Sequence, residues 1–497
     1  MLLNEYISSN EMKAIELNSQ YLGVSKLLLM ENAGSGITQY VKDNYPKKKS
    51  VIIVCGLGGN GGDGFVAARH LSAEGYSIEV FFLGKSEIIR SPESSINYKS
   101  LKAMTDTVKI TEIQDSSDIP TLKADIIIDA LIGIGIKGPL RSPYKQMVEK
   151  INESKAIKIS VDIPSGMNAD TGETHNYSIT PDQILTFHKR KTGIRKLTST
   201  IVPIGIPFEA STQTGPGDVY IANKPRNTDA YKGTFGKLLV IGGNETYIGA
   251  PALAGMAAYA TGVDIVHVAA PESAVSTIAT YSPSLITTKL KGSHITEKNV
   301  KQIGTLLKRF DTLVMGPGLG DHPDTIKAIQ RILDVVEVPL VLDADALKAL
   351  TDYEGKLPLK TVLTPHKGEF RILTGKRLEG NLSDKEIVQK QAAKLSATVL
   401  LKSKVDIISD GKYVRTSHTG NSGMTVGGTG DVLAGITAAY LAMGAEPFEA
   451  ACAAAFVSGK AGDVALENMG YNFEASNVIN RIPYVIRDCL EGKMVRI

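Results

Sequence analysis

The chain has 497 residues, of which 43% are hydrophobic and 22% charged, and its formal net charge is +3. A chain of this length is expected to hold about two to four domains. The composition is that of a globular protein, and the balanced charge excludes nucleic acid or an anionic membrane as the main partner. No apolar run approaches the roughly 20 residues needed to cross a bilayer, and the N-terminus lacks the pattern of a signal peptide. The cysteines Cys55, Cys452 and Cys489 match neither a disulfide framework nor a metal-binding spacing, so we expect a cytoplasmic protein.

Apolar stretches of strand length alternate with helix-like amphipathic segments along most of the chain, which is typical of parallel α/β architecture. The alternation is lost where Thr, Gln, Gly, Pro and Asn dominate, so we place a linker at residues 211–228, between a domain at 1–210 and a domain at 229–497. In the first domain the predicted strands are Ser50–Cys55, Ile78–Leu83, Asp125–Ala130 and Ile157–Asp162. The predicted helices are Phe65–Glu74 and Ser94–Met104. In the second domain the predicted strands are Thr312–Met315, Leu340–Leu342, Val362–Leu363 and Val399–Leu401. The predicted helices are Asp431–Met443 and Glu449–Leu466.

A glycine-rich loop, Gly56–Gly64, follows the first strand and precedes a helix, which is the context of a dinucleotide site. Asp63 is unexpected there because its carboxylate would lie where a pyrophosphate approaches, and capping of the helix is the alternative role. Two later strands end at Asp129 and Asp162. Since the carboxyl ends of parallel strands line one crevice, we expect one pocket to receive polar side chains from three strand ends. These side chains are Asn60 and Asp63, Asp129 and Lys137, and Asp162 and Ser165.

These segments resemble the NAD(P)H-hydrate epimerase family. The resemblance rests on four segments and covers residues 1–210: Met30–Gly34, Gly56–Gly64, Asp129–Gly135 and Val161–Gly166. It implies a Rossmann-like, three-layer domain that interconverts the R and S epimers of hydrated NADH or NADPH and binds potassium. By position, Asn60, Asp129 and Ser165 would hold potassium. The residues that would bind the hydrated nucleotide are Gly59, Asn60, Gly61, Gly62, Asp63, Gly133, Ile134, Gly135, Ile136, Lys137, Gly138, Pro139 and Asp162.

Epimerisation at C6 of the nicotinamide ring requires either ring opening or loss and return of water. We hypothesise that Asp162 and Lys137 form the acid–base pair for this step. The sequence departs from the family pattern at Gly59, where the family usually has an asparagine. That departure removes one amide side chain and leaves Asn60 in place.

A second glycine-rich loop, Gly427–Gly430, precedes an apolar helix near the C-terminus. Its backbone N–H groups are suited to phosphate oxygens or to developing negative charge. Asp431 at the mouth of this loop either caps the helix or is a general base for a hydroxyl that attacks the terminal phosphate of a nucleotide. The His366–Glu369 segment predicts a magnesium ligand at Glu369, with a surface turn as the alternative.

Two further strand ends of the second half carry charged side chains. Asp343 and Asp345 follow one strand, where helix capping is an equally good explanation. Lys402 follows another strand, and it either contacts a nucleotide phosphate or is an ordinary solvated lysine.

The second half resembles the ADP-dependent NAD(P)H-hydrate dehydratase family, a branch of the ribokinase-like fold. The resemblance rests on these segments: Lys232–Gly236, Ile248–Pro251, Gly316–Gly320, Leu342–Leu347, Leu363–His366 and Gly427–Asp431. It implies phosphorylation of the C6 hydroxyl of the S hydrate by ADP with magnesium, followed by elimination of phosphate to restore NADH or NADPH. Asp431 would be the base and Gly430 the anion-hole donor. The hydrate would contact Ala252, Gly318, His366 and Asp431, and the nucleotide Lys402, Ser403, Lys404, Val405, Asp406 and Gly430.

The second half departs from its family pattern at two positions, Tyr231 in place of a histidine and Ser403 in place of a glycine. Together the halves resemble a bifunctional metabolite-repair enzyme, in which the epimerase supplies the epimer that the dehydratase accepts. The resemblance also implies a homo-oligomer whose partners are small molecules, hydrated NADH or NADPH and ADP. The alternative is a ribokinase-like small-molecule kinase with an N-terminal nucleotide-sensing domain.

Overall fold

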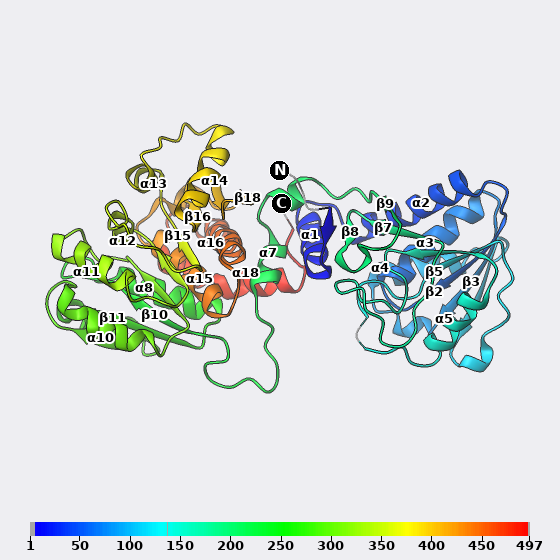
Figure 1. The fold of residues 1–497 in the computed structure, drawn as a ribbon, viewed down its shortest axis with the longest axis horizontal. Helices are drawn as coiled ribbons and strands as arrows, with labels where there is room; N and C mark the ends of the chain where they lie inside the picture. Colours follow the sequence, from blue (N-terminus) through cyan, green and yellow to red (C-terminus); the bar gives the residue numbers. More distant parts are fainter. Residues whose placement is uncertain (1–4, 137, 496–497) are drawn as a thin grey trace. The chain divides into compact units, whose positions relative to one another are not determined.

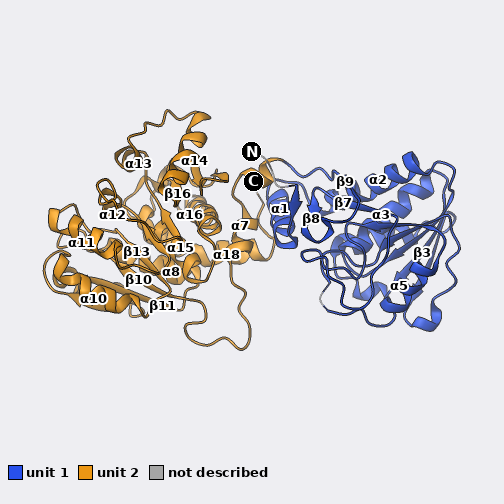
Figure 2. Cartoon of the chain, viewed as in Figure 1, with its two compact units in different colours: residues 1–207 blue, residues 208–497 orange. Residues whose placement is uncertain are grey.

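The computed structural model describes residues 5–136 and 138–495. The chain divides into two compact units, Met1–Pro207 and Phe208–Ile497, which are coloured separately in Figure 2. Each unit is an α/β domain with its own sheet. Within the described residues, no helix combines the length and the apolar character that a membrane crossing requires. Cys55, Cys452 and Cys489 are buried free thiols.

The first unit is built on a seven-stranded sheet in which every neighbouring pair of strands is parallel. In spatial order the strands are β4 (Val108–Ile113), β3 (Ser77–Leu83), β2 (Ser50–Cys55), β5 (Ile126–Ala130), β6 (Ile157–Val161), β7 (Gln183–Phe187) and β9 (Ser199–Val202). The chain therefore builds the sheet outward in one direction from β2 and then in the other direction from β5. This is the Rossmann arrangement, and its topological switch point lies between β2 and β5.

Helices cover both faces of this sheet, which makes three layers (Figure 1). They are α2 (Lys26–Asn44), α3 (Gly59–Ala73), α4 (Pro92–Lys102) and α5 (Tyr144–Glu153). Alternate residues of β2 face opposite layers: Ile52 belongs to the core cluster that includes Val148 of α5, whereas Ile53 and Cys55 lie under Gly64 of α3. The three-layer Rossmann-like prediction for the first half is confirmed.

The N-terminal segment forms a small second sheet in the first unit. Strand β1 (Tyr6–Ile7) pairs in parallel with β8 (Arg190–Lys191), and helix α1 (Ser9–Tyr21) follows β1. A capping box formed by Ser8 and Glu11 starts α1. Hydrogen bonds from Ser9 to the Asp170 carboxylate attach the same segment to the loop after β6. The start of the described chain is therefore fixed beside the strand that ends in Lys191.

The predicted strands of the first half agree with β2, β3, β5 and β6 to within one residue at each end. The predicted helix Phe65–Glu74 begins too late, because α3 begins at Gly59 and includes most of the glycine-rich loop. Glycine has low helix propensity, but packing requires it here. A Cβ atom on Gly61 would lie 2.0 Å from the carbonyl oxygen of Gly56, so only glycine lets the first turn of α3 approach the end of β2.

The second unit is built on a nine-stranded sheet. In spatial order the strands are β12 (Ile286–Leu290), β11 (Ile265–Pro271), β10 (Lys237–Ile241), β13 (Thr312–Met315), β14 (Leu340–Leu342), β15 (Thr361–Leu363), β16 (Thr398–Leu401), β17 (Asp406–Ser409) and β18 (Val414–Ser417). The pairs from β12 to β16 are parallel, and β17 and β18 are antiparallel to their neighbours. The predicted α/β class is confirmed, with an antiparallel edge, and the switch point lies between β10 and β13.

Helices again lie on both faces of the sheet. They are α8 (Ala250–Thr261), α9 (Glu272–Tyr281), α10 (Glu297–Leu307), α11 (Pro323–Leu333), α12 (Asp345–Lys348), α13 (Lys367–Thr374), α14 (Ser383–Leu395), α15 (Thr429–Ala442), α16 (Pro447–Met469), α17 (Ala475–Ile479) and α18 (Ile482–Leu490). One core cluster joins Leu239 and Leu313 of the sheet to Ile329 of α11 and Phe370 of α13. Helices α15 and α16, which are rich in alanine, contact each other and the sheet strands.

Residues 211–228, for which the sequence predicts a linker, contain part of α6 (Glu209–Thr212) and all of α7 (Pro216–Ala222). Helix α7 contacts α16 and α18. Asp218 of α7 is buried and forms an ion pair with Arg415 of β18. The composition of this segment is that of a loop, but buried Val219 and the ion pair attach it to the second unit.

Candidate active sites

The carboxyl ends of β5 and β6 meet at a fully buried aspartate in the first unit. Asp129 Oδ1 accepts hydrogen bonds from Ser165 Oγ at 2.5 Å and Leu131 N at 3.3 Å. Its Oδ2 accepts hydrogen bonds from Ser160 Oγ at 2.8 Å and Ser165 N at 2.9 Å. Burial raises the pKa of Asp129, and the hydrogen bonds, chiefly those from Ser165, act in the opposite direction. Asp129 and Ser165, predicted from two strand ends, are therefore in direct contact.

Asn60 lies on the first turn of α3 beside the same group. A Cβ atom on Gly133 would lie 3.3 Å from Asn60 Cγ and Oδ1, and Ser165 Oγ accepts a hydrogen bond from the N–H of the preceding residue, Ile132, at 2.9 Å. Asn60 Nδ2 is buried and has no hydrogen-bond partner in the described part of the chain. A buried amide without a hydrogen-bond partner destabilises the fold. A rotation of the Asn60 amide by about 180° would place its oxygen where its nitrogen now lies. Amide, carboxylate and hydroxyl oxygens suit hard cations, so the three residues fit a potassium ion.

Asp162 follows β6 in a left-handed backbone conformation, with φ of 64°. Its Oδ1 accepts hydrogen bonds from Phe187 N at 3.1 Å and Thr186 Oγ1 at 3.3 Å. The same oxygen forms an ion pair with Lys191, whose side chain is fully buried. Lys137, the predicted partner of Asp162, lies outside the described residues. The cation that the structure places on Asp162 is Lys191, which the sequence analysis missed.

Two further carboxyl groups share the surroundings of Asp162. Asp63 lies beyond the first turn of α3, and the N-cap is Gly58, so the capping alternative for Asp63 is wrong. Burial raises the pKa of Asp63 well above its usual value, and Asp162 and Glu16 raise it further. Burial likewise raises the pKa of Glu16 on α1, and Lys191 opposes that shift. Four charged or titratable groups from four segments therefore meet at this edge: Glu16, Asp63, Asp162 and Lys191.

The loop after β5 supplies the remaining predicted substrate contacts. The side chain of Ile134 packs against the core cluster of Ile163 and Ile194, and that of Ile136 packs against the cluster above β5. Contacts from these two residues to a ligand would therefore come from the backbone. Gly59, Gly135 and Gly138 all border open space, so the asparagine usual at position 59 would have room.

In the second unit, a charged group joins the ends of β14 and β16. Asp343 is buried, and its Oδ1 accepts hydrogen bonds from Lys402 Nζ and Thr364 Oγ1, each at 2.7 Å. A Cβ atom on Gly430 would lie 3.4 Å from Lys402 Nζ and 4.0 Å from Asp343 Oδ2. Burial lowers the pKa of Lys402, but Asp343 and Glu369 raise it by more. The lysine predicted to meet a phosphate thus lies against the predicted anion-hole glycine.

Asp431 lies in the first turn of α15, whose N-cap is Gly428 in a left-handed conformation. The cap residue is Gly428, so helix capping by Asp431, the alternative role, is wrong. Burial and then Asp343 raise the pKa of Asp431 to about 7, although Lys402 lowers it. A carboxylate with this pKa is suited to general base catalysis near neutral pH.

His366 and Glu369 start helix α13 as a capping box. His366 Nδ1 accepts the N–H of Gly368 at 2.9 Å, and Glu369 Oε2 accepts the N–H of His366 at 2.8 Å. The motif therefore begins a helix, and Glu369 has a structural role independent of metal. Lys402 N donates to Pro365 O at 2.8 Å, which brings His366 beside Lys402.

The predicted hydrate contacts Ala252 and Gly318 lie near the switch point of the second sheet. Gly318 has φ of 68°, and its Cβ position would lie 2.5 Å from the carbonyl oxygen of Tyr247. Ala252 is buried in the first turn of α8. The adjacent Gly320 N donates to Asp345 Oδ2 at 2.8 Å. The ends of β10, β13 and β14 are therefore joined at one edge.

Residues 402–405 form the turn between β16 and β17, and Asp406 begins β17. Ser403 N donates to Asp406 Oδ1 at 2.8 Å, and Ser403 Oγ donates to Val405 O at 2.6 Å. Burial raises the pKa of Asp406 to about 7, against the Ser403 hydrogen bond and Lys402. Ser403 is absent from the residues with positive φ, so the turn does not need the glycine usual there. Lys404 and Val405 belong to the same turn, and Tyr231 is a highly exposed residue of a separate turn.

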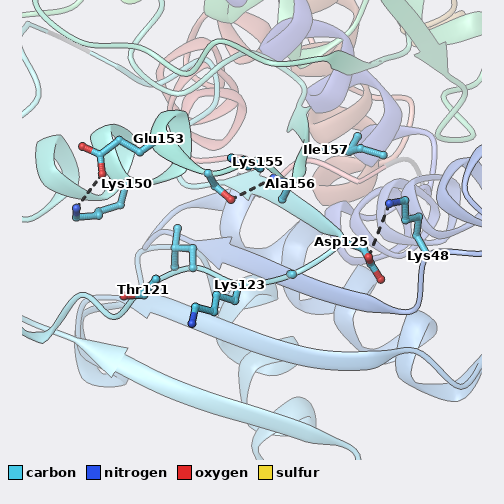
Figure 3. A pocket seen from close by; sticks show the side chains of 12 residues that line it. Lys48, Thr121, Lys123, Asp125, Lys150, Glu153, Lys155, Ala156 and Ile157 are labelled. Atoms are coloured by element: carbon cyan, nitrogen blue, oxygen red, sulfur yellow. Dashed lines mark hydrogen bonds and ion pairs between the residues drawn. The ribbon is translucent and has the colours of Figure 1, made fainter.

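Two other features do not belong to these edges. A cavity of about 460 Å³ lies at the amino ends of β5 and β6 and is lined by Lys48, Lys123, Lys150 and Lys155 among others (Figure 3). It is at the opposite edge of the sheet from Asp129. His294, His322 and Asp324 form a cluster of metal-ligand type, but His322 Nδ1 already accepts the N–H of Asp324 as a helix cap.

Comparison with known proteins agrees with this division of the chain. A family model described as YjeF-related protein N-terminus matches residues 26–193, and one described as NAD(P)H-hydrate dehydratase matches residues 238–484. A hypothetical protein of Streptococcus mutans has a similar structure, with a TM-score of 0.50 and 25% identity over 55% of this chain and 97% of that one. A ribokinase-like superfamily protein of Enterococcus faecalis has a TM-score of 0.50 and 24% identity over 57% of this chain and 97% of its own. The ribokinase-like prediction for the second half is confirmed.

Curated relatives match the chain through both units. The bifunctional NAD(P)H-hydrate repair enzyme Nnr of Pyrobaculum aerophilum is 41% identical over 97% of this chain and 98% of its own. The enzyme of the same name from Hyperthermus butylicus is 41% identical over 99% of this chain and 94% of its own. The chain therefore belongs to the family of bifunctional NAD(P)H-hydrate repair enzymes.

Proposed function

We propose that the first unit epimerises hydrated NADH and NADPH at C6, and that the second unit dehydrates the S hydrate with ADP as phosphoryl donor. The observation that carries the second activity is Asp431, a carboxylate with pKa of about 7 in the first turn of a glycine-started helix. Lys402 adds a cation beside Gly430. A base, an anion-binding helix end and an ammonium group are the parts that phosphoryl transfer to a hydroxyl requires.

In the dehydratase reaction, Asp431 takes the proton from the C6 hydroxyl as its oxygen attacks the terminal phosphorus of ADP. The bond from that phosphorus to the bridging oxygen breaks, and AMP leaves with the electron pair. The N–H of Gly430 and the ammonium of Lys402 stabilise the charge on the transferred group. The ring nitrogen then expels phosphate from C6, and loss of the C5 proton restores the nicotinamide double bond. Phosphate is a far better leaving group than hydroxide, which is the physical reason for using a phosphoryl donor.

Magnesium is expected to enter this site with the nucleotide, since this ion is held largely by phosphate oxygens and water. Its contribution would be to neutralise the charge on the transferred phosphoryl group. Glu369, the predicted magnesium ligand, uses Oε2 to cap α13. Phosphates and water are therefore expected to supply most of the ligands.

In the epimerase reaction, Asp162 accepts and returns a proton while the configuration at C6 is lost and regained. The N-terminus of α3, in which Gly58 makes no side-chain cap, presents free backbone N–H groups to the phosphates of the substrate. Potassium at Asn60, Asp129 and Ser165 would fix these phosphates beside Asp162. We infer Lys137 as a second proton-transfer group from the family resemblance alone.

The test of both activities is the recovery of reduced-nicotinamide absorbance from a mixture of R and S NADH hydrates, with magnesium, potassium and either ADP or ATP. Complete recovery in a fast and a slower phase supports both activities, and the better donor identifies the nucleotide. Recovery that stops when the S epimer is consumed would refute the epimerase activity. A stable phosphorylated product without recovery would instead support a small-molecule kinase.

We also propose a cellular location and an oligomeric state for the protein. A cytoplasmic location is supported by the three buried free thiols. A homo-oligomer is inferred from the family resemblance, and the molar mass in solution, measured by light scattering, tests it.

A further inference from the structure

Lys191 is a charged residue of the first unit to which the family resemblance assigns no role. Its side chain is fully buried, which is rare for lysine unless it is paired. The ammonium group has three partners: Asp162 Oδ1, Phe187 O at 3.0 Å and Thr186 Oγ1 at 3.4 Å. All three of its N–H donors are thereby used. Lys191 therefore has no donor left for a substrate.

Among the described residues, the hydrogen bonds to the Asp162 carboxylate all reach one oxygen. Oδ1 receives the N–H of Phe187, the hydroxyl of Thr186 and the ammonium of Lys191. No hydrogen bond from residues 5–136 or 138–495 reaches Oδ2. The side chain of Asp162 retains 12% exposure, so the carboxylate is held by Oδ1 and leaves Oδ2 for the reaction.

The backbone supports the same orientation. Asp162 has φ of 64°, a conformation that is unfavourable for most residues but tolerated by aspartate. Strand β8, which ends in Lys191, is held by β1 through the pairs Tyr6–Arg190 and Ile7–Lys191. Strained backbone persists only where its surroundings over-determine it. The N-terminal segment therefore fixes Lys191, and Lys191 fixes Asp162.

We propose that Lys191 is a positioning residue of the epimerase site, which anchors Oδ1 of Asp162 so that Oδ2 is the atom that exchanges a proton with the hydrated nicotinamide ring. This inference rests on the proposed epimerase activity of the first unit. Lys191 acts through Asp162 and does not itself contact the substrate. The proton moves between Oδ2 and the substrate, and the ion pair on Oδ1 is kept throughout the cycle.

The groups that face this pair come from several elements. Glu16 on α1 and Asp63 on α3 are carboxyl groups whose pKa values are raised by burial. His188, two residues after Thr186, has its pKa lowered to about 4 by burial and by the two lysines beside it. In all three groups burial disfavours the charged form, which weakens their competition with Asp162 for Lys191.

The experiment compares the full-length wild type with Lys191→Met, and uses Lys196→Met, an exposed lysine of the same unit, as the matched control. The assay follows conversion of pure R hydrate to NADH under conditions in which epimerisation, and not dehydration by the second unit, limits the rate. Conversion of pure S hydrate by the same sample reports the second unit. We expect Lys191→Met to lower kcat for the R hydrate by about 10²-fold or more, with little change in KM and in the S-hydrate rate.

The pH profile separates positioning from a purely structural role. A buried carboxylate without its cation takes up a proton more readily, so the acid limb of R-hydrate turnover should move to higher pH in Lys191→Met. A wild-type kcat with an unchanged acid limb would overturn the inference. If the wild type itself does not convert the R hydrate, the proposed epimerase function fails instead.

A second variant covers the case in which Lys191→Met does not fold, as judged by its thermal unfolding transitions. Thr186→Val removes one donor to Oδ1 and keeps both charges. We expect its kcat for the R hydrate to fall several-fold with KM unchanged. A wild-type kcat in a folded Thr186→Val protein, when Lys191→Met is unfolded, would overturn the inference.

Discussion

The charge around Asp431 leads to a specific pH dependence of the dehydratase. The group's pKa is raised from 3.8 to about 7, first by burial and then by Asp343, and it is lowered by Lys402. The base must be ionised to accept a proton, so turnover should rise with pH through this value. With a pKa of about 7, roughly one-tenth of the carboxylates are ionised at pH 6 and roughly nine-tenths at pH 8. We therefore expect about a tenfold rise in turnover over this interval.

The assay is the initial rate of NADH formation from S hydrate with saturating ADP and magnesium, measured from pH 5.5 to 9. The terminal phosphate of ADP titrates in the same range, so the wild-type curve alone does not identify the group. Variants of the neighbours do. Asp343→Asn removes a negative charge that raises the pKa of Asp431, so its acid limb should move to lower pH. Lys402→Met removes a positive charge, so its limb should move to higher pH.

Asp431→Asn is the reference for this series. Loss of the base is expected to lower kcat by about 10²- to 10⁴-fold. It should also abolish the part of the acid limb that is due to ionisation of Asp431 and leave the part that is due to ADP. The fold of each variant is checked by its thermal unfolding at both ends of the pH range. Identical midpoints in the wild type, Asp343→Asn and Lys402→Met would refute the assignment of the limb to Asp431, as would a flat profile between pH 6 and 8.

Three further outcomes are expected. Asp162→Asn, a change that keeps the tolerance for positive φ, should lower R-hydrate turnover by about 10²- to 10⁴-fold and leave S-hydrate turnover unchanged; equal losses with both epimers would contradict the division of labour. Replacing potassium by sodium should slow the wild-type epimerase, whereas Asn60→Ala should be slow in both salts; a salt effect that survives in Asn60→Ala would place the ion elsewhere. Gly61→Ala should lower the free energy of unfolding of the first unit by about 1–3 kcal/mol because its Cβ meets the Gly56 carbonyl at 2.0 Å. Gly59→Ala borders open space and should be neutral or stabilising by about 0.5–1 kcal/mol in urea unfolding, and equal destabilisation in both variants would argue against the helix start at Gly59.

Much of both sites could be predicted because parallel strands end at one edge. Asp129, Asp162 and Ser165 follow apolar runs in the sequence, and the order of a Rossmann sheet brings those ends together. The same logic applies in the second unit, where Asp343 and Lys402 follow two different strands and lie beside Gly430. Local pattern was sufficient here because each side chain follows a strand whose apolar run is easily recognised.

Lys191 could not be predicted in the same way. It ends a strand of two residues, and that strand exists only because β1, far away in sequence, pairs with it. A two-residue strand has no periodicity to detect. Glu16 was missed for a related reason, since it lies on an amphipathic helix whose polar residues are usually solvated. Burial of these charges is set by tertiary contacts that composition does not record.

The magnesium interpretation of Glu369 and the linker assignment failed to anticipate structural roles. A histidine followed three residues later by glutamate is compatible with both a metal pair and a capping box. The contact of Glu369 with the His366 N–H establishes the capping box, and the magnesium interpretation stays a prediction. In the predicted linker, Thr, Gln, Gly, Pro and Asn dominate, but the ion pair of Asp218 with Arg415 attaches α7 to the second unit. The two residues are separated by 197 positions, so local sequence patterns could not predict the ion pair.

The two units place a lysine differently, and the difference follows from what each proposed base must do. In the first unit Lys191 binds the proposed base directly, which fixes one carboxylate oxygen and leaves the other for a proton that must move both ways. In the second unit Lys402 binds Asp343 instead, and Asp431 keeps a raised pKa because Asp343 opposes its ionisation. The proposed dehydratase base accepts a proton once per turnover. A lysine bound directly to Asp431 would stabilise its anion and weaken it as a base, whereas on Asp343 the same lysine remains 3.4 Å from the Cβ position of Gly430, the proposed anion-hole donor.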